Sequence, residues 1–271
     1  MGIGLQNRFS FGNVIGMKMK SIGVLFRKDI LYLIKSARTP ICLFMLVIPV
    51  IIGLNFAMES SSDMLTQYQV DMNFFWSPIS YLAILIRLVT IIVASDAISS
   101  EFSYRTILTI SAAPISRRNI FLSKFITALL YILFLEILVL IPYYLLLGSV
   151  LGLFPSLQAL AAAFSITILM SFFGISLSLT ISTISRNTVM SILIPFLYLY
   201  TGVQLLSMLQ LDWFVYEYHY QAVETVLHSW IDSGILEFAV ADALSLAWII
   251  VTPSLLLLVS LIHFTKVDLR V

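Results

Sequence analysis

Two ionisable side chains, Arg87 and Glu136, lie in the middle of long apolar stretches. Charged groups at membrane depth are costly, and they usually pair with each other or serve an ion or proton pathway. If both stretches are helices that cross a bilayer, the two residues differ in depth by roughly 5–10 Å, which two long side chains can bridge. We therefore consider an ion pair between them. The alternative is an arginine that reaches the interface and a glutamate that is protonated or faces a water-filled cavity.

The motifs of several catalytic classes are missing from the sequence. It has no Gly-Lys pair, and therefore no Gly-x-x-x-x-Gly-Lys-Ser/Thr loop for nucleotide phosphates. It also has no His-Glu-x-x-His, no Gly-x-Ser-x-Gly and no histidine in the middle of an apolar span. We predict a chain that is not an enzyme, with no catalytic residue, metal or cofactor of its own. The alternatives are a secondary transporter or an intramembrane enzyme that uses Arg87 and Glu136.

The composition requires a membrane. Of the 271 residues, 60% are hydrophobic and only 11% are charged, whereas about 25% are charged in soluble domains. The net charge of +1 gives no reason to expect nucleic acid as a partner. The single cysteine cannot form a disulfide framework. We expect no cleavable signal, because the first apolar run begins near residue 39 behind a basic segment.

The apolar stretches predict an all-α integral membrane protein with six transmembrane helices in one domain, residues 1–271. A spanning helix needs about 20 apolar residues. Six stretches meet this requirement, approximately 39–58, 74–95, 121–147, 157–184, 189–208 and 243–264.

The charges predict the orientation of these helices. All Lys and Arg residues except Arg87 fall in the N-terminal segment, near 96–124, near 185–188 or in the C-terminal tail. The opposite connections, which include the outer segment 209–242, contain acids and no basic residue. The positive-inside rule then predicts a multi-pass plasma membrane protein with both termini in the cytoplasm. Aromatic residues of the outer segment, such as Tyr216 and Tyr220, are expected to mark the membrane interface.

The segment at about 20–38 predicts an amphipathic helix on the cytoplasmic membrane face. Its basic residues fall within one arc of about 80° when 100° is allowed for each residue. Such a helix can place basic side chains on lipid phosphate and its apolar face in the acyl boundary. We expect an interfacial helix that also contacts a cytoplasmic partner, the alternative being a basic anchor that only fixes topology. Its charged residues include Arg27, Lys28, Asp29, Lys35 and Arg38.

The longest connection on the basic side, at about 96–120, has a definite pattern. Glu101 and Arg105 are four positions apart, a spacing that supports an ion pair on a helix. An apolar stretch follows, and Pro114 ends it because the residue before a proline avoids the helical region. Lys124 lies near the start of the next predicted spanning helix, where its long side chain can extend to the membrane–water interface.

This pattern resembles the membrane subunits of type-2 ATP-binding-cassette (ABC) exporters. Their pattern is a glutamate, then glycine or arginine with threonine, an apolar stretch, Pro-hydrophobic-Ser-Arg, and a lysine at the start of the third span. The matching positions here are Glu101, Arg105, Thr106, Pro114, Ile115, Ser116, Arg117 and Lys124. The stretch Arg27-Lys28-Asp29, ahead of Arg38-Thr39, is similar to the basic-acidic pair before the first span of that family.

The resemblance implies a permease subunit that forms the translocation pathway of an exporter with a second permease, as a homodimer or heterodimer. A separate ABC ATPase subunit would use ATP and Mg²⁺ to drive transport, and membrane lipid is the remaining partner. The N-terminal helix would dock on the ATPase together with the 96–120 connection. The residues expected to couple the two subunits are Glu101, Arg105, Thr106, Pro114 and Arg117.

Overall fold

The computed structural model describes residues 23, 25–60, 65–103, 116–211, 215–236 and 239–266. These residues form helices and no strand. Six helical segments are long and apolar enough to cross a membrane, so the predicted fold class is confirmed. They are Arg38–Glu59, Gln67–Phe102, Arg117–Leu151, Leu157–Ser185, Thr188–Met208 and Val240–Lys266.

The helices differ from the predicted spans mainly at their ends. A helix at residues 25–35, here called the N-terminal helix, precedes the first span. The connection predicted at about 96–120 is shorter than expected, because the second span remains helical to Ser103 and the third begins at Arg117. The elements are α2 (Arg38–Ser60), α3 (Gln67–Gln69), η1 (Val70–Trp76, a π-helix), α4 (Ser77–Ser103), α6 (Arg117–Leu151), α7 (Leu157–Ser185), α8 (Thr188–Leu197), η2 (Tyr198–Gly202, a π-helix), α9 (Val203–Met208), α10 (Tyr216–Ser233) and α11 (Val240–Lys266).

Local sequence explains where several helices begin and end. Ser116, Ser156 and Asn187 each accept a hydrogen bond from a backbone N–H of the first turn of α6, α7 or α8, which satisfies a donor that the helix leaves open. Gly152 follows α6 with a φ of 69°, a left-handed conformation that glycine adopts without steric cost.

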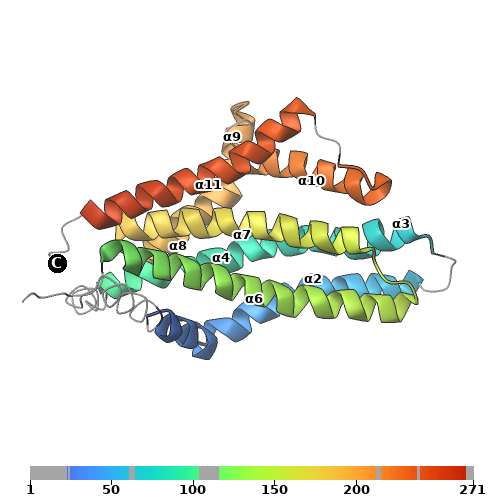
Figure 1. Cartoon of the computed structure of the whole chain (residues 1–271), viewed down its shortest axis with the longest axis horizontal. Coiled ribbons are helices and arrows are strands. Elements are labelled where there is room, and N and C mark those ends of the chain that lie inside the picture. The colour runs from blue at the N-terminus through green and yellow to red at the C-terminus, as the bar shows by residue number, and fades with distance from the viewer. Residues whose placement is uncertain are drawn as a thin grey trace, which may run out of the picture.

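The centre of the bundle is the contact between α4 and α7, which is the most extensive between any two elements described. Gly174 of α7 faces Thr90 of α4 so closely that a Cβ at residue 174 would overlap Thr90 Oγ1. Small residues allow membrane helices to approach in this way, and close packing then supplies the contact energy. The helices α2, α8 and α11 surround this centre (Figure 1) and leave most of their apolar side chains exposed, as expected of a surface in lipid.

The outer segment contains the helix α10, in agreement with the outer helices that the resemblance to type-2 exporters implies before the last span. α10 begins level with the middle of α7, where Tyr216 Oη donates a hydrogen bond to Leu169 O at 3.0 Å. It then runs along α7 and α11 (Figure 1). Tyr216 and Tyr220 are buried, so their assignment to the membrane interface is wrong. They are packing residues that hold α10 against the bundle.

Basic residues from distant parts of the chain gather at one end of the bundle, here called the basic end. The N-terminal helix, the start of α6 and the last turn of α11 all lie there (Figure 1). Arg117 Nη1 donates to Thr265 O at 3.4 Å and so links α6 to α11. Arg186, at the turn between α7 and α8, places its guanidinium over the ring of Phe102 near the end of α4, 5.1 Å from the centroid.

Candidate functional site at the basic end

A buried ammonium group joins three helices at the basic end. Lys124 Nζ of α6 donates to Asp29 Oδ1 of the N-terminal helix at 3.0 Å and to Glu101 Oε1 of α4 at 2.8 Å. All three residues are at most 9% exposed. Lys28 Nζ, at 3.8 Å from Glu101 Oε1, adds a weaker and more exposed ion pair. Because Coulomb attraction is poorly screened in such a site, Lys124 fixes the N-terminal helix to the bundle.

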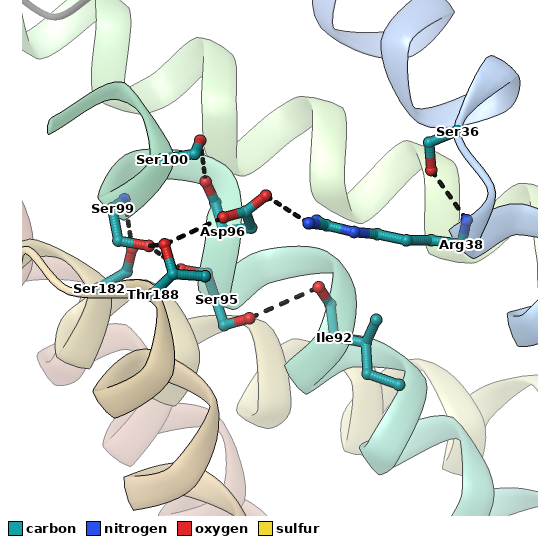
Figure 2. Close-up of polar contacts among 9 residues, drawn as sticks. All are labelled: Ser36, Arg38, Ile92, Ser95, Asp96, Ser99, Ser100, Ser182 and Thr188. Atoms are coloured by element: carbon teal, nitrogen blue, oxygen red, sulfur yellow. Dashed lines mark hydrogen bonds and ion pairs between the residues drawn. The ribbon is translucent and has the colours of Figure 1, made fainter. Parts of the chain in front are cut away.

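A second ion pair continues the network toward α8. Arg38 Nη2, in the first turn of α2, lies 2.7 Å from Asp96 Oδ2 of α4 (Figure 2). Thr188 Oγ1, in the first turn of α8, donates to Asp96 Oδ1 at 3.3 Å. Both oxygens of this buried carboxylate therefore have partners, and the carboxylate ties α2 to α4 and α8.

Small hydroxyl side chains hold α4 to α7 beside this ion pair. The backbone N–H of Ser99 donates to Ser182 Oγ of α7 at 2.9 Å, and Ser99 Oγ lies 3.3 Å from Thr188 Oγ1 (Figure 2). Ser99 and Ser182 are fully buried. The two ion-pair clusters thus lie along the same stretch of α4, with Asp96 and Glu101 five positions apart.

A cavity of about 240 Å³ lies between the N-terminal helix, the start of α2, α4 and α6. All the charged residues just described line it: Lys28, Asp29, Arg38, Asp96, Glu101 and Lys124. Its remaining walls are largely apolar, with Leu33, Val93, Ala97 and Ala128 among them. The arrangement can bind an ionic group and can transmit a movement of the N-terminal helix to α4 and α6.

The residues predicted for the interfacial helix divide into two sets. Arg27, Lys28 and Lys35 are exposed, as expected of side chains that face solvent or lipid phosphate. Asp29 and Arg38 turn inward instead, and each forms an ion pair with a residue of another helix.

The predicted coupling residues are also divided. Glu101 is an internal member of the Lys124 network rather than an exposed docking residue. Arg117 is half-buried and contacts α11. Arg105, Thr106 and Pro114 lie outside the described residues.

The two intramembrane charges are not in contact with each other. Glu136 of α6 is fully buried and accepts a hydrogen bond from Ser171 Oγ of α7 at 2.5 Å, while its Oε2 has no hydrogen-bond partner among the described residues. Arg87 of α4 points toward α10, where its guanidinium lies 5.7 Å from the ring centroid of Tyr220, and it takes part in further interactions. Arg87 is 5% exposed, so it does not extend to the interface as the alternative interpretation supposed.

Sequence reasoning did not foresee the role of Lys124 or Asp96. One signal was available: the basic regions contain few acids, and Asp29, Asp96 and Glu101 are three of them. An acid that is rare among many cations is a natural partner for one of them. Each of these three carboxylates does pair with a cation from another helix. No cluster of metal ligands occurs in the part of the chain that the structure describes.

A comparison with protein families identifies this architecture. A family model described as ABC-2 family transporter protein matches residues 33–202. The chain belongs to the ABC-2 transporter family. The match extends from the N-terminal helix to η2, so it includes Arg38, Asp96, Glu101 and Lys124 of this ABC-2 permease. No curated protein matched the chain in a separate comparison.

The family and the six spanning helices together make the chain a multi-pass membrane subunit of an ABC transporter. The resemblance seen at Glu101 to Lys124 in the sequence is therefore confirmed at the level of the family. In this ABC-2 permease, the ionic network lies where the N-terminal helix meets the membrane domain.

Proposed function

We propose that the chain is the permease subunit of an ABC exporter. It forms the translocation pathway with a second permease subunit and is driven by a separate ATPase subunit. The observation that carries this proposal is the Lys124 network, because it joins the N-terminal helix to α4 and α6 through buried ion pairs. A force applied to the N-terminal helix or to the α4–α6 connection then moves the spanning helices as a unit.

The orientation and the partner follow from charge and sequence. By the positive-inside rule, the basic end faces the cytoplasm, and the membrane is the plasma membrane. The sequence has no phosphate-binding loop, so ATP and Mg²⁺ belong to the partner subunit. The export direction is supported by the resemblance to type-2 exporters in the segment from Glu101 to Lys124.

The first experiment is affinity purification of the full chain in mild detergent, with mass spectrometry of the proteins that accompany it. An ABC ATPase subunit should co-purify. The two subunits, reconstituted in vesicles, should hydrolyse ATP, and the permease alone should not. ATP hydrolysis by the isolated permease, or failure of any ATPase subunit to accompany it, would contradict the proposal.

A second experiment tests the coupling itself. Glu101→Gln weakens the charge-assisted hydrogen bond from Lys124 without removing the side chain, and we expect it to reduce transport-coupled hydrolysis several-fold while both subunits still assemble. Arg118→Ala is the matched control, because Arg118 is an exposed charge at the start of the same α6 helix. Equal stimulated hydrolysis in wild type, Glu101→Gln and Arg118→Ala would show that the network does not couple the subunits.

A further inference from the structure

The cavity of the basic end presents cations outward and keeps its acids inside. The side chains of its three acids, Asp29, Asp96 and Glu101, are each 10% or 11% exposed. Those of Lys28 and Arg38 are 57% and 34% exposed. A ligand that reaches the cavity from outside therefore meets positive charge first, although the three cations and three acids that line it carry no net charge.

Both exposed cations can contact a ligand while they keep their present partners. Lys28 Nζ is 3.8 Å from Glu101 Oε1, which is longer than a charge-assisted hydrogen bond. Arg38 contacts Asp96 through Nη2, and a guanidinium has five N–H donors that suit a phosphate. Lys28 also lines a shallower pocket together with Tyr32 and Lys35, so the positive surface continues along the N-terminal helix.

The wall of the cavity changes from charged to apolar with distance from the basic end. Along α4 its lining extends from Glu101 through Asp96 to Val93, a length of about 12 Å at 1.5 Å per residue. On α6, Lys124 is followed one turn deeper in the bundle by Ala128. An anionic head with a hydrocarbon tail matches this order better than a soluble anion does.

We propose that this cavity binds one phospholipid with a net negative headgroup, of the phosphatidylglycerol class. The phosphate contacts Lys28 and Arg38, and the first acyl carbons lie against Val93 and Ala128. Basic pockets between spanning helices on the cytoplasmic side take anionic headgroups in this way. The cavity holds about 240 Å³, the space of roughly eight water molecules at about 30 Å³ each, so one headgroup fits and two do not. This binding requires neither the ATPase subunit nor the direction of transport proposed above.

Native mass spectrometry of the purified full chain, with added phosphatidylglycerol or phosphatidylcholine of identical acyl chains, tests the site. Both lipids carry the phosphate, but only phosphatidylglycerol has a net negative charge. Each nearby Lys or Arg contributes roughly a fivefold factor to the affinity for an anionic headgroup, so two of them should give phosphatidylglycerol an advantage of about twentyfold. Equal binding of the two lipids to wild type would overturn the proposal.

Lys28→Gln removes one of the two cations and should reduce this advantage about fivefold. Lys266→Gln is the matched control, because Lys266 is an exposed lysine of the same end that lies on α11, outside the cavity. It should keep the full advantage. Equal reductions in the two variants would show a diffuse attraction to the basic end and would overturn the site.

Ala97→Leu keeps every charge and tests the cavity itself. Ala97 lines the cavity and is only partly buried, so a leucine there fills part of the space without entering the core, and the two lipids should then bind about equally. An unchanged advantage would contradict a phosphate inside the cavity. Inorganic phosphate at the same concentration should leave phosphatidylglycerol bound, and full displacement would assign the site to free phosphate instead.

Discussion

Lys124 pairs with two buried carboxylates from two different helices. Such an ion pair is costly to desolvate, but breaking it by removal of one partner is more costly still, because a charge then remains buried alone. Local spacing suggested Glu101 and Arg105 as partners, and Arg105 lies outside the described residues. Among the described residues, Glu101 pairs with Lys124, 23 positions away, and more weakly with Lys28. Spacing along a helix predicts neighbours on that helix and carries no information about a charge that another helix brings.

Lys124→Met should lower the free energy of unfolding by about 3–5 kcal/mol, because Asp29 and Glu101 lose the ammonium that they share. Thermal unfolding in detergent measures the change. Lys35→Met, at an exposed position of the N-terminal helix, is the control and should change stability by less than about 0.5 kcal/mol. Equal losses in the two variants would contradict a structural role for Lys124.

Glu136→Gln should be nearly neutral for stability, because an amide can still accept the hydrogen bond of Ser171. Glu136→Ala should cost more, since it leaves a buried hydroxyl without its partner and opens a space. The losses of unfolding free energy caused by Glu136→Ala and Arg87→Ala should add within about 0.5 kcal/mol in the double variant, because no described contact joins the two residues. A coupling energy well above that value in a double-mutant cycle would restore the ion pair that their positions in the sequence suggested.

At the scale of the elements, the sequence predicted the spanning helices well. A run of about 20 apolar residues is long enough to cross the bilayer, and a helix satisfies its backbone hydrogen bonds within the segment. The length of an apolar run does not detect α10, whose acids and aromatic residues resemble those of a surface segment, and only the family resemblance implied a helix there. Tyr216 and Tyr220 are buried only because α7 and α11 provide a surface for them, and that surface exists only in the assembled bundle.

Gly174→Ala should disturb the central contact between α4 and α7. The added Cβ overlaps Thr90 Oγ1, and overpacking of this kind costs about 1–3 kcal/mol. Thermal unfolding should show the loss, and adding Thr90→Ala to this variant should recover part of it. Gly202→Ala is the control, because the nearest atom to its new Cβ would lie at 3.6 Å, an ordinary contact. A tolerated Gly174→Ala would mean that the two helices can separate without cost.

The packing of α10 should weaken in acid. Burial lowers the pKa of His228, although the negative charge of Glu224 opposes this effect. The His228 ring packs edge-on against Trp76, with 5.0 Å between the ring centroids. A base with a lowered pKa binds fewer protons in the folded state, so its contribution is complete above about pH 6.5 and declines as the pH falls below that value. The unfolding temperature should therefore fall between about pH 7 and 5, and His228→Phe should reduce this dependence. An unchanged pH profile in the variant would assign the effect to other groups.

At the scale of the whole molecule, the distribution of charge predicts which end of the bundle faces the cytoplasm. Cysteine placed at Asp232 should react with a membrane-impermeant thiol reagent in intact cells, and cysteine placed at Lys35 should not. Both positions are exposed, and the native Cys42 is fully buried, so it should give little background. Labelling at residue 35 but not at residue 232 would reverse the orientation.

The distance in sequence between Asp29 and Lys124 has a consequence for synthesis of the protein. The two residues are 95 positions apart. At a translation rate of about 5–20 residues per second, the ribosome needs roughly 5–20 s to add Lys124 after Asp29. Asp29 exists throughout that interval, and Glu101 for only its last 23 residues, without the cation that they share. A nascent chain that stalls before residue 124 therefore lacks the cation that fixes the N-terminal helix to the bundle.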